Sequence, residues 1–232
     1  MMQGELPALT CAQVREVDRR AIAELGIPGM VLMENASRAL AGAVHAMRGN
    51  SNAPVAILCG GGNNGGDGYA LARLLACEGV PSILFAAKDP GELTGDAGRQ
   101  VHIVRCLGMT IHELAAPDSP ARLGACSLWV DALLGTGFHG RIEGALQQAM
   151  APLSALRSAA GAQVLAVDLP SGLDADSGSV DPRALRADRT VTFVARKVGF
   201  RSSEATGFLG QVQVASIGVP GDWVRQILGL GA

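Results

Sequence analysis

The chain has 232 residues and a formal net charge of −2 at pH 7. This length suits one α/β domain with a full core, so we expect residues 1–232 to form a single domain. The charges form no block of one sign, which argues against nucleic acid or an anionic membrane as a partner, and no apolar run approaches the roughly 18 residues of a membrane span. Five scattered cysteines without a CxxC pair argue against disulfides and zinc. We therefore expect a reduced, cytoplasmic protein whose partner is a small molecule.

Two helices are predicted ahead of the first strand. Thr10 and Gln13 form a capping box for a helix that ends near Gly26 and Pro28. Apolar residues at helical spacing then predict a second helix from about 30 to 47.

From residue 55 onward, the pattern predicts an alternation of strands and helices. The expected strands lie near 55–59, 82–87, 109–114, 128–134 and 163–169, and the expected helices near 67–78, 94–107 and 143–160. Such alternation, with nearly continuous apolar strands, predicts an α/β fold with a mostly parallel central sheet covered by helices on both faces. Two further strands, near 190–195 and 211–217, have no long helix between them. Since the alternation of strand and helix stops here, we expect the sheet to end in an edge of different orientation.

The loop after the first strand is unusually rich in glycine. Residues 60–68 read GGGNNGGDG, and the glycines allow positive φ and a close approach of the backbone to a ligand. A simple turn, with Asp67 capping the next helix, accounts for one or two of these glycines and leaves the two asparagines unexplained. The run also matches GxGxxG, the dinucleotide fingerprint. The next strand ends in Ala86 and Ala87 instead of the acidic residue that holds ribose, which disfavours an ordinary NAD-dependent oxidoreductase.

Two aspartates interrupt or close strongly apolar strands. Asp131 precedes the loop LLGTGFHGR, and Asp168 precedes LPSG. An unpaired charge is costly in such a strand, and ligands of parallel sheets bind beyond the carboxyl ends of the strands. We therefore expect the two carboxylates to converge there. The alternative for each one alone is a capping or loop-bracing role, and His139 has no necessary role on sequence grounds.

Four segments, in order and spacing, resemble the NAD(P)H-hydrate epimerases (YjeF N-terminal domain family). They are MENA at 33–36, GGGNNGGDG at 60–68, DALLGTGFHG at 131–140 and VDLPSG at 167–172. The resemblance implies a Rossmann-like three-layer αβα sandwich, a homodimer, and interconversion of the R and S forms of hydrated NADH and NADPH (NADHX and NADPHX). The alternative is a non-catalytic nucleotide-binding or protein-interaction module of the same fold.

The resemblance also assigns roles by motif. Asp168 is implied as the catalytic residue, which also contacts substrate. The implied substrate-binding residues are Asn63, Asn64, Gly65, Gly66, Asp67, Gly135, Thr136, Gly137, Phe138, His139, Gly140 and Arg141. The implied side-chain ligands of one potassium ion (K+) per subunit are Asn64, Asp131 and Ser171. One carboxylate with neutral oxygen donors suits such a weakly held ion better than zinc or magnesium.

The chain departs from the family pattern in one segment. Residues 192–199 read TFVARKVG, where the family more often reads TFGAPKPG. In many bacteria the epimerase is fused to an ADP- or ATP-dependent dehydratase, and this chain ends at Ala232. We therefore expect no dehydration by this polypeptide and a separate S-specific dehydratase as its functional partner.

Overall fold

The computed structural model describes residues 6–230. The helices are α1 (Cys11–Glu24), α2 (Gly29–Arg48), α3 (Asn63–Cys77), α4 (Gly95–Cys106), α5 (Ser119–Gly124), α6 (Gly144–Met150), α7 (Leu153–Ala160), α8 (Ser203–Leu209) and α9 (Gly221–Ile227), with 3₁₀ turns η1 (Pro90–Glu92) and η2 (Val198–Arg201). The strands are β1 (Val55–Cys59), β2 (Ser82–Ala86), β3 (Ile111–Glu113), β4 (Leu128–Ala132), β5 (Gln163–Val167), β6 (Arg189–Phe193) and β7 (Gln211–Ala215).

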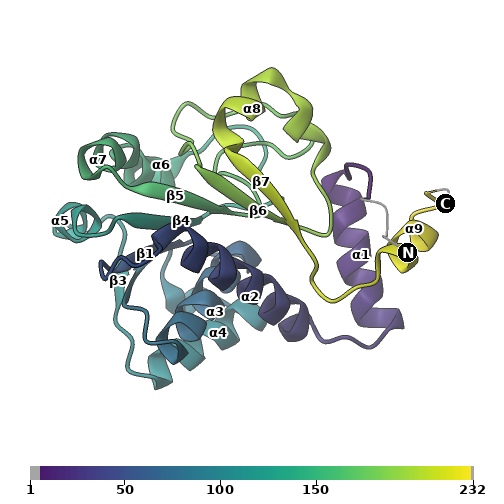
Figure 1. Cartoon of the computed structure of the whole chain (residues 1–232), viewed down its shortest axis with the longest axis horizontal. Coiled ribbons are helices and arrows are strands. Elements are labelled where there is room, and N and C mark those ends of the chain that lie inside the picture. The colour runs from purple at the N-terminus through teal and green to yellow at the C-terminus, as the bar shows by residue number, and fades with distance from the viewer. Residues whose placement is uncertain (1–5, 231–232) are drawn as a thin grey trace.

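The seven strands form one sheet in the order β3-β2-β1-β4-β5-β6-β7, and every pairing is parallel. Helices α2, α3 and α4 lie on one side of the sheet and α5, α6 and α7 on the other (Figure 1). This three-layer α/β arrangement confirms the predicted fold class. Within residues 6–230, no helix combines the length and apolarity needed to cross a membrane.

The two faces of the sheet are both buried, as the apolar strands predict. Along β1, Ile57 and Cys59 pack in the core beneath α2 and α3, whereas Ala56 and Leu58 pack in the core on the opposite face. Side chains alternate between faces with a period of two, so a strand with helices on both sides must be apolar at every position.

Two predictions about the second half of the fold were wrong. The expected edge of different orientation does not exist, because β7 pairs parallel to β6. The short elements η2 and α8 lie between these strands, and this connection exceeds the dozen or so residues that a parallel crossover requires, without a long helix. The helix expected over 143–160 is two helices, which separate at Pro152, because proline lacks the N–H that a continuous helix requires.

The two leading helices have different roles. The predicted capping box of α1 is present, with both Thr10–Gln13 bonds formed. Helix α2 packs on the sheet, whereas α1 stands at the end of the sheet where the strands finish (Figure 1). Two backbone hydrogen bonds hold the chain ahead of α1 in this place. Leu9 N donates to Arg196 O (2.8 Å), and Leu9 O accepts from Val198 N (3.0 Å).

The glycine run begins helix α3 earlier than the sequence predicted. The helix starts at Asn63 instead of near 67, so only Gly60, Gly61 and Gly62 remain as a loop. None of the six glycines in the run has positive φ, contrary to the expected use of that freedom. A Cβ on Gly65 would lie 2.1 Å from Gly60 O, so the glycine lets the first turn of α3 pack against the end of β1.

We predict that Gly65→Ala destabilises the protein by about 3 kcal/mol, since the added methyl meets backbone that cannot move aside. Gly62→Ala is the matched control in the same run, because a Cβ there meets nothing within 4 Å; we expect it to cost about 1 kcal/mol or less. Urea unfolding followed by circular dichroism measures both. Equal stability of the two variants would contradict the packing role of Gly65.

Candidate active site at the carboxyl ends of the strands

A cavity of ≈ 760 Å³ lies where the carboxyl ends of the central strands face α1. Strand β1 pairs with β2 on one side and β4 on the other, so the order of strands reverses between β1 and β4. Open α/β sheets bind ligands at this switch point. The loops after β1 and β4 both line the cavity.

Most of the predicted substrate-binding residues line this cavity. They are Asn63, Asn64, Asp67, Gly135, Thr136, Gly137, Phe138, His139 and Asp168. Four others do not belong to the lining: Gly65 and Gly66 are buried in α3, and Gly140 and Arg141 are exposed beyond the cavity. Their contact with substrate stays a prediction.

Asp168 presents one oxygen to the cavity and binds the protein with the other. Its Oδ1 accepts hydrogen bonds from Thr192 Oγ1 (2.9 Å), Phe193 N (3.1 Å) and Lys197 Nζ (2.7 Å). Its Oδ2 accepts no hydrogen bond from any residue in 6–230. The backbone of Asp168 has φ of 65°, a conformation in which non-glycine residues often mark functional sites. The carboxylate is therefore fixed in place with one oxygen free.

Lys197 is the most important site residue that the sequence prediction missed. Its side chain is fully buried, and Nζ also donates to Thr192 Oγ1 (2.8 Å) and to the carbonyls of Phe193 (2.9 Å) and Ala195 (3.2 Å). A buried ammonium needs a paired anion and further acceptors, and Asp168 is that anion. The signal was present in the segment 192–199, where the lysine matches the family pattern although its neighbours do not.

Two further carboxyl groups line the cavity close to Asp168. Burial raises the pKa of Asp18, on α1, to about 6; the charge of Asp168 raises it too, and that of Lys197 opposes the shift. Burial, followed by the charges of Asp168 and Asp18, raises the pKa of Asp67 well above its ordinary value. Asp67 thus keeps its proton at a pH where an ordinary carboxyl group is ionised. Sequence reasoning missed Asp18, because it lies in a helix that ordinary packing already explains.

The three predicted potassium ligands converge on residues 133–135. Asp131 is fully buried and accepts from Ser171 Oγ (2.5 Å), Ser171 N (2.8 Å) and Leu133 N (3.3 Å). Ser171 Oγ also accepts from Leu134 N (2.8 Å), and Asn64 Nδ2 donates to Leu134 O (3.0 Å). Asp131 and Ser171 lie beneath the cavity lining instead of in it.

The donor set around Asp131 fits a monovalent cation. Burial raises the pKa of this carboxyl group, and the hydrogen bonds from Ser171 oppose that shift. No lysine, arginine or histidine among residues 6–230 pairs with it, so a carboxylate here lacks a counter-charge. The same residues hold no cluster of three His, Cys, Asp or Glu side chains suited to a metal. A carboxylate with hydroxyl, amide and carbonyl oxygens fits K+ better than a transition metal.

Three basic side chains line the cavity: Arg15, Lys88 and His139. His139 Nδ1 lies 2.9 Å from Asp174 Oδ2, and this contact orients the imidazole ring. Asp174 is itself held by the backbone amides of Asp176 and Ser177. On sequence grounds His139 had no necessary role beyond the motif, and only the fold brings Asp174 to it.

The segment that departs from the family pattern forms part of the cavity wall. Val194 replaces the pattern's glycine at φ of 67°, a strained conformation for a β-branched residue. Val198 replaces a proline and donates its N–H to Leu9 O, a bond that proline cannot make. This wall is therefore held by an added hydrogen bond to the segment ahead of α1.

We predict that Lys197→Met destabilises the protein by about 3 kcal/mol at pH 8, because it leaves the Asp168 carboxylate buried without its cation. The double variant Lys197→Met/Asp168→Asn recovers part of the loss, since the unpaired charge is gone. Lys88→Met is the control: this exposed lysine pairs with Glu92 at the surface, so the expected change is about 0.5 kcal/mol or less. Urea unfolding measures these variants and Asp168→Asn alone, and additive effects of the two single variants would rule out the coupling.

The chain is similar in sequence to a known protein family and to named relatives. The family model described as YjeF-related protein N-terminus matches residues 29–199. An NAD(P)H-hydrate epimerase of Rhodopirellula baltica is 39% identical, with 96% of this chain and 88% of the relative covered. An NAD(P)H-hydrate epimerase of Pirellula staleyi is 38% identical, with 92% of this chain and 93% of the relative covered.

Longer relatives and a solved structure match as well. A bifunctional NAD(P)H-hydrate repair enzyme Nnr of Salinibacter ruber is 37% identical over 92% of this chain, which spans 41% of that protein. The crystal structure of yeast ynu0 superposes with a TM-score of 0.76 at 22% identity, covering 91% of this chain and 88% of the yeast chain, and thus shares the fold. The matched segment includes both loops of the cavity, Asp168 and Lys197, and the chain belongs to the family of YjeF-related protein N-terminal domains.

Proposed function

We propose that this protein is an isomerase that interconverts the R and S forms of NADHX and NADPHX. Relatives named NAD(P)H-hydrate epimerase align along nearly the whole chain. The observation that carries the proposal is Asp168, whose single free oxygen faces a cavity at the switch point of the sheet.

The start of α3 suits the pyrophosphate of such a dinucleotide. Helix N-termini present unpaired amides and a positive dipole end to anions, and Gly61 to Asn64 line the cavity there. Asp67, one turn further along, would repel phosphate as a carboxylate. Its raised pKa keeps it neutral instead, and this removes the objection.

Asp168 is the proposed proton-transfer group of the reaction. The substrate carries a hydroxyl at C6 of the nicotinamide ring, next to the ring nitrogen, and a change of configuration requires that centre to open and close again. The three donors on Oδ1 hold the carboxyl group in place, while Oδ2 remains free to take or return a proton. The pair with Lys197 is buried, so its orientation is maintained during turnover.

Potassium is the proposed cofactor, one ion per subunit, held by Asp131, Ser171 and Asn64. When bound, the ion supplies a fixed positive charge beneath the loop after β4. The residues of this chain do the remaining work there: Ser171 and Asn64 both contact Leu134 and so hold that loop beside the start of α3.

The S hydrate leaves this enzyme for a separate ADP- or ATP-dependent dehydratase, in the cytoplasm. Two copies of the chain form a homodimer, for which the exposed apolar side chains Ile22, Leu25 and Val31 near the α1–α2 turn are suitable.

We predict that Asp168→Asn lowers kcat about 10² to 10⁴-fold for purified R or S hydrate, since the proton-transfer group is lost. Chiral chromatography of the hydrates follows the reaction. Glu113→Gln, at an exposed strand end away from the cavity, is the control and keeps full activity. Undiminished epimerisation by folded Asp168→Asn would remove this residue from the mechanism. Nucleotide binding by the wild type without any epimerisation would favour the non-catalytic module.

For the cation, we predict that KCl raises the melting temperature of the wild type above that in tetramethylammonium chloride of equal ionic strength, since an ion that binds only the folded state stabilises it. Asp131→Asn lacks this difference, because the ligand that carries the charge is gone. Asp118→Asn, an exposed carboxylate in a surface pair with Arg122, retains it. An equal response of wild type and Asp131→Asn would contradict the site, whatever the activity.

A further inference from the structure

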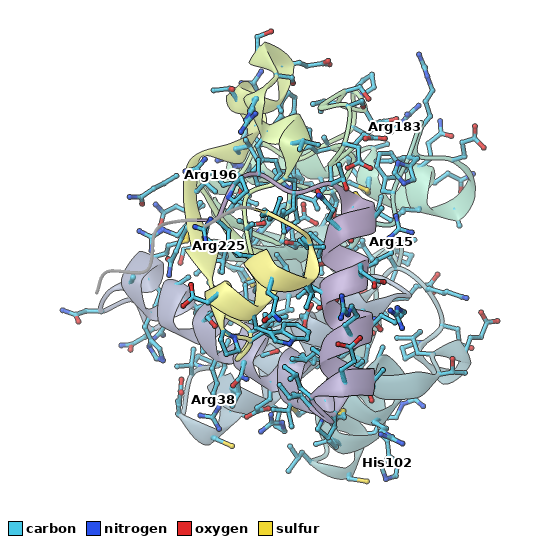
Figure 2. The ribbon with its side chains drawn as sticks, turned by 90° about the vertical axis from the view of Figure 1, so that its right-hand side faces the viewer. Arg15, Arg38, His102, Arg183, Arg196 and Arg225 are labelled. Atoms are coloured by element: carbon cyan, nitrogen blue, oxygen red, sulfur yellow. The ribbon has the colours of Figure 1, made fainter. Side chains whose placement is uncertain are left out.

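Helix α1 places one carboxyl group, Asp18, in the wall of the cavity that faces Asp168. The cavity-lining residues of this helix are Val14, Arg15, Asp18 and Ile22, which recur at three- and four-residue spacing on one face. Figure 2 shows α1 and α9 side by side across this end of the molecule, with Arg15 on the flank of α1 away from α9. Asp18 thus stands one turn from apolar neighbours on either side, in a position where packing alone favours an apolar residue.

The side chain of Asp18 has no partner among residues 6–230. No hydrogen bond or salt bridge involves it there, although Glu16 and Glu24 of the same helix are paired with arginines. The charges that act on it are those of Asp168 and Lys197 at the strand ends, and its own charge acts on Asp67 of α3. Helix α2 presents only apolar side chains to the same space: Leu32, Met33 and Ala36. A partly buried carboxyl group without a partner is costly, and such groups concentrate at functional sites.

We infer that Asp18 is a second catalytic carboxyl group, acting on the face of the nicotinamide ring opposite to Asp168. The inference rests on the proposed function and adds to it the residue that serves the second face. Epimerisation removes a hydroxyl from one face of C6 and adds one to the other, so each face requires a group that can give or take a proton. Asp168 belongs to the strand ends and Asp18 to the helix across the cavity, so the two come from different walls.

The step is balanced in protons and electrons. Asp18 donates a proton to the C6 hydroxyl, the C6–O bond breaks, and its electron pair leaves with the resulting water. The lone pair of the ring nitrogen forms a C=N bond to C6, which gives a cationic ring. A water on the other face then adds to C6 and releases its proton to Asp168. The reverse reaction starts with the proton on Asp168.

The charges of the cavity suit this cationic ring. Asp67 is neutral, so once Asp18 has given up its proton, two carboxylates, Asp18 and Asp168, lie near one buried ammonium, Lys197. Fixed negative charge placed where positive charge develops stabilises the transition state. With its pKa near 6, Asp18 can exist in both protonation states close to neutral pH, as an acid–base group requires.

The test compares Asp18→Asn with Glu16→Gln, a control on the exposed side of the same helix. Purified R and S hydrates are each supplied to the enzymes, and kcat and KM are measured in both directions after the uncatalysed rate is subtracted. We expect Asp18→Asn to lower kcat about 10² to 10³-fold in both directions with less than about a threefold change in KM. In Asp18→Ala, added formate restores part of the rate, because a small carboxylic acid fills the vacated position.

Stability separates a catalytic Asp18 from a structural one. In the folded state the pKa of Asp18 is raised to about 6 from 3.8, so the fold favours the protonated form. The stability that Asp18 contributes is therefore full below pH 4 and is lost as the pH rises through 6. Asp18→Asn removes that loss and therefore melts about 5 °C higher than the wild type at pH 8, with little difference near pH 4. A structural Asp18 gives the opposite result: lower melting temperature, lower activity and no rescue by formate.

Two further readouts test the chemistry. The wild-type kcat/KM falls as the pH rises through about 6, and the residual activity of Asp18→Asn lacks this decline. In water labelled with ¹⁸O, each turnover brings one labelled oxygen into the hydroxyl at C6, whereas epimerisation without label contradicts C–O cleavage. Full activity of Asp18→Asn beside an active wild type overturns the role of Asp18 alone. An inactive wild type overturns the proposed function, and the inference falls with it.

Discussion

The buried contact between Lys197 and Asp168 holds the site together. It joins the end of β5 to the segment after β6, and the same segment pairs with Leu9 and so positions α1 over the strand ends. The backbone of Asp168 takes a positive φ that is unfavourable for aspartate, and three donors on one oxygen maintain it. Because the ammonium is fully buried, its direct contacts with the protein specify this geometry.

On the other side of the cavity, close packing at Gly65 positions the loops after β1 and β4. The first turn of α3 lies against the end of β1 because Gly65 has no Cβ to separate them. This contact brings Asn64 within 3.0 Å of the loop after β4, where Ser171 and Asp131 also bind. Two loops that are seventy residues apart in the chain (64 and 134) thereby become one wall of the cavity.

The raised pKa values in the cavity result from burial more than from the number of charges. Asp67 and Asp18 are ordinary aspartates in the sequence, yet burial and the charge of Asp168 raise the pKa of both. A neutral Asp67 is compatible with phosphate at the start of α3, and an Asp18 that titrates near 6 is compatible with proton exchange. The pattern of charges in the sequence contains neither property, because both arise from groups that meet only in the fold.

The sequence by itself determined the parallel α/β architecture, both strand-end loops, and Asp131 and Asp168 as the carboxylates between them. These features follow from local rules: apolar strands, glycine-rich turns and the position of charges at strand ends. Only the tertiary structure decided that β7 is parallel, that the glycines serve packing instead of positive φ, and that Lys197 and Asp18 belong to the site. Each of these depends on contacts between distant segments, since a lysine after β6 and an aspartate in the first helix have no meaning until the strand ends and α1 enclose the same cavity.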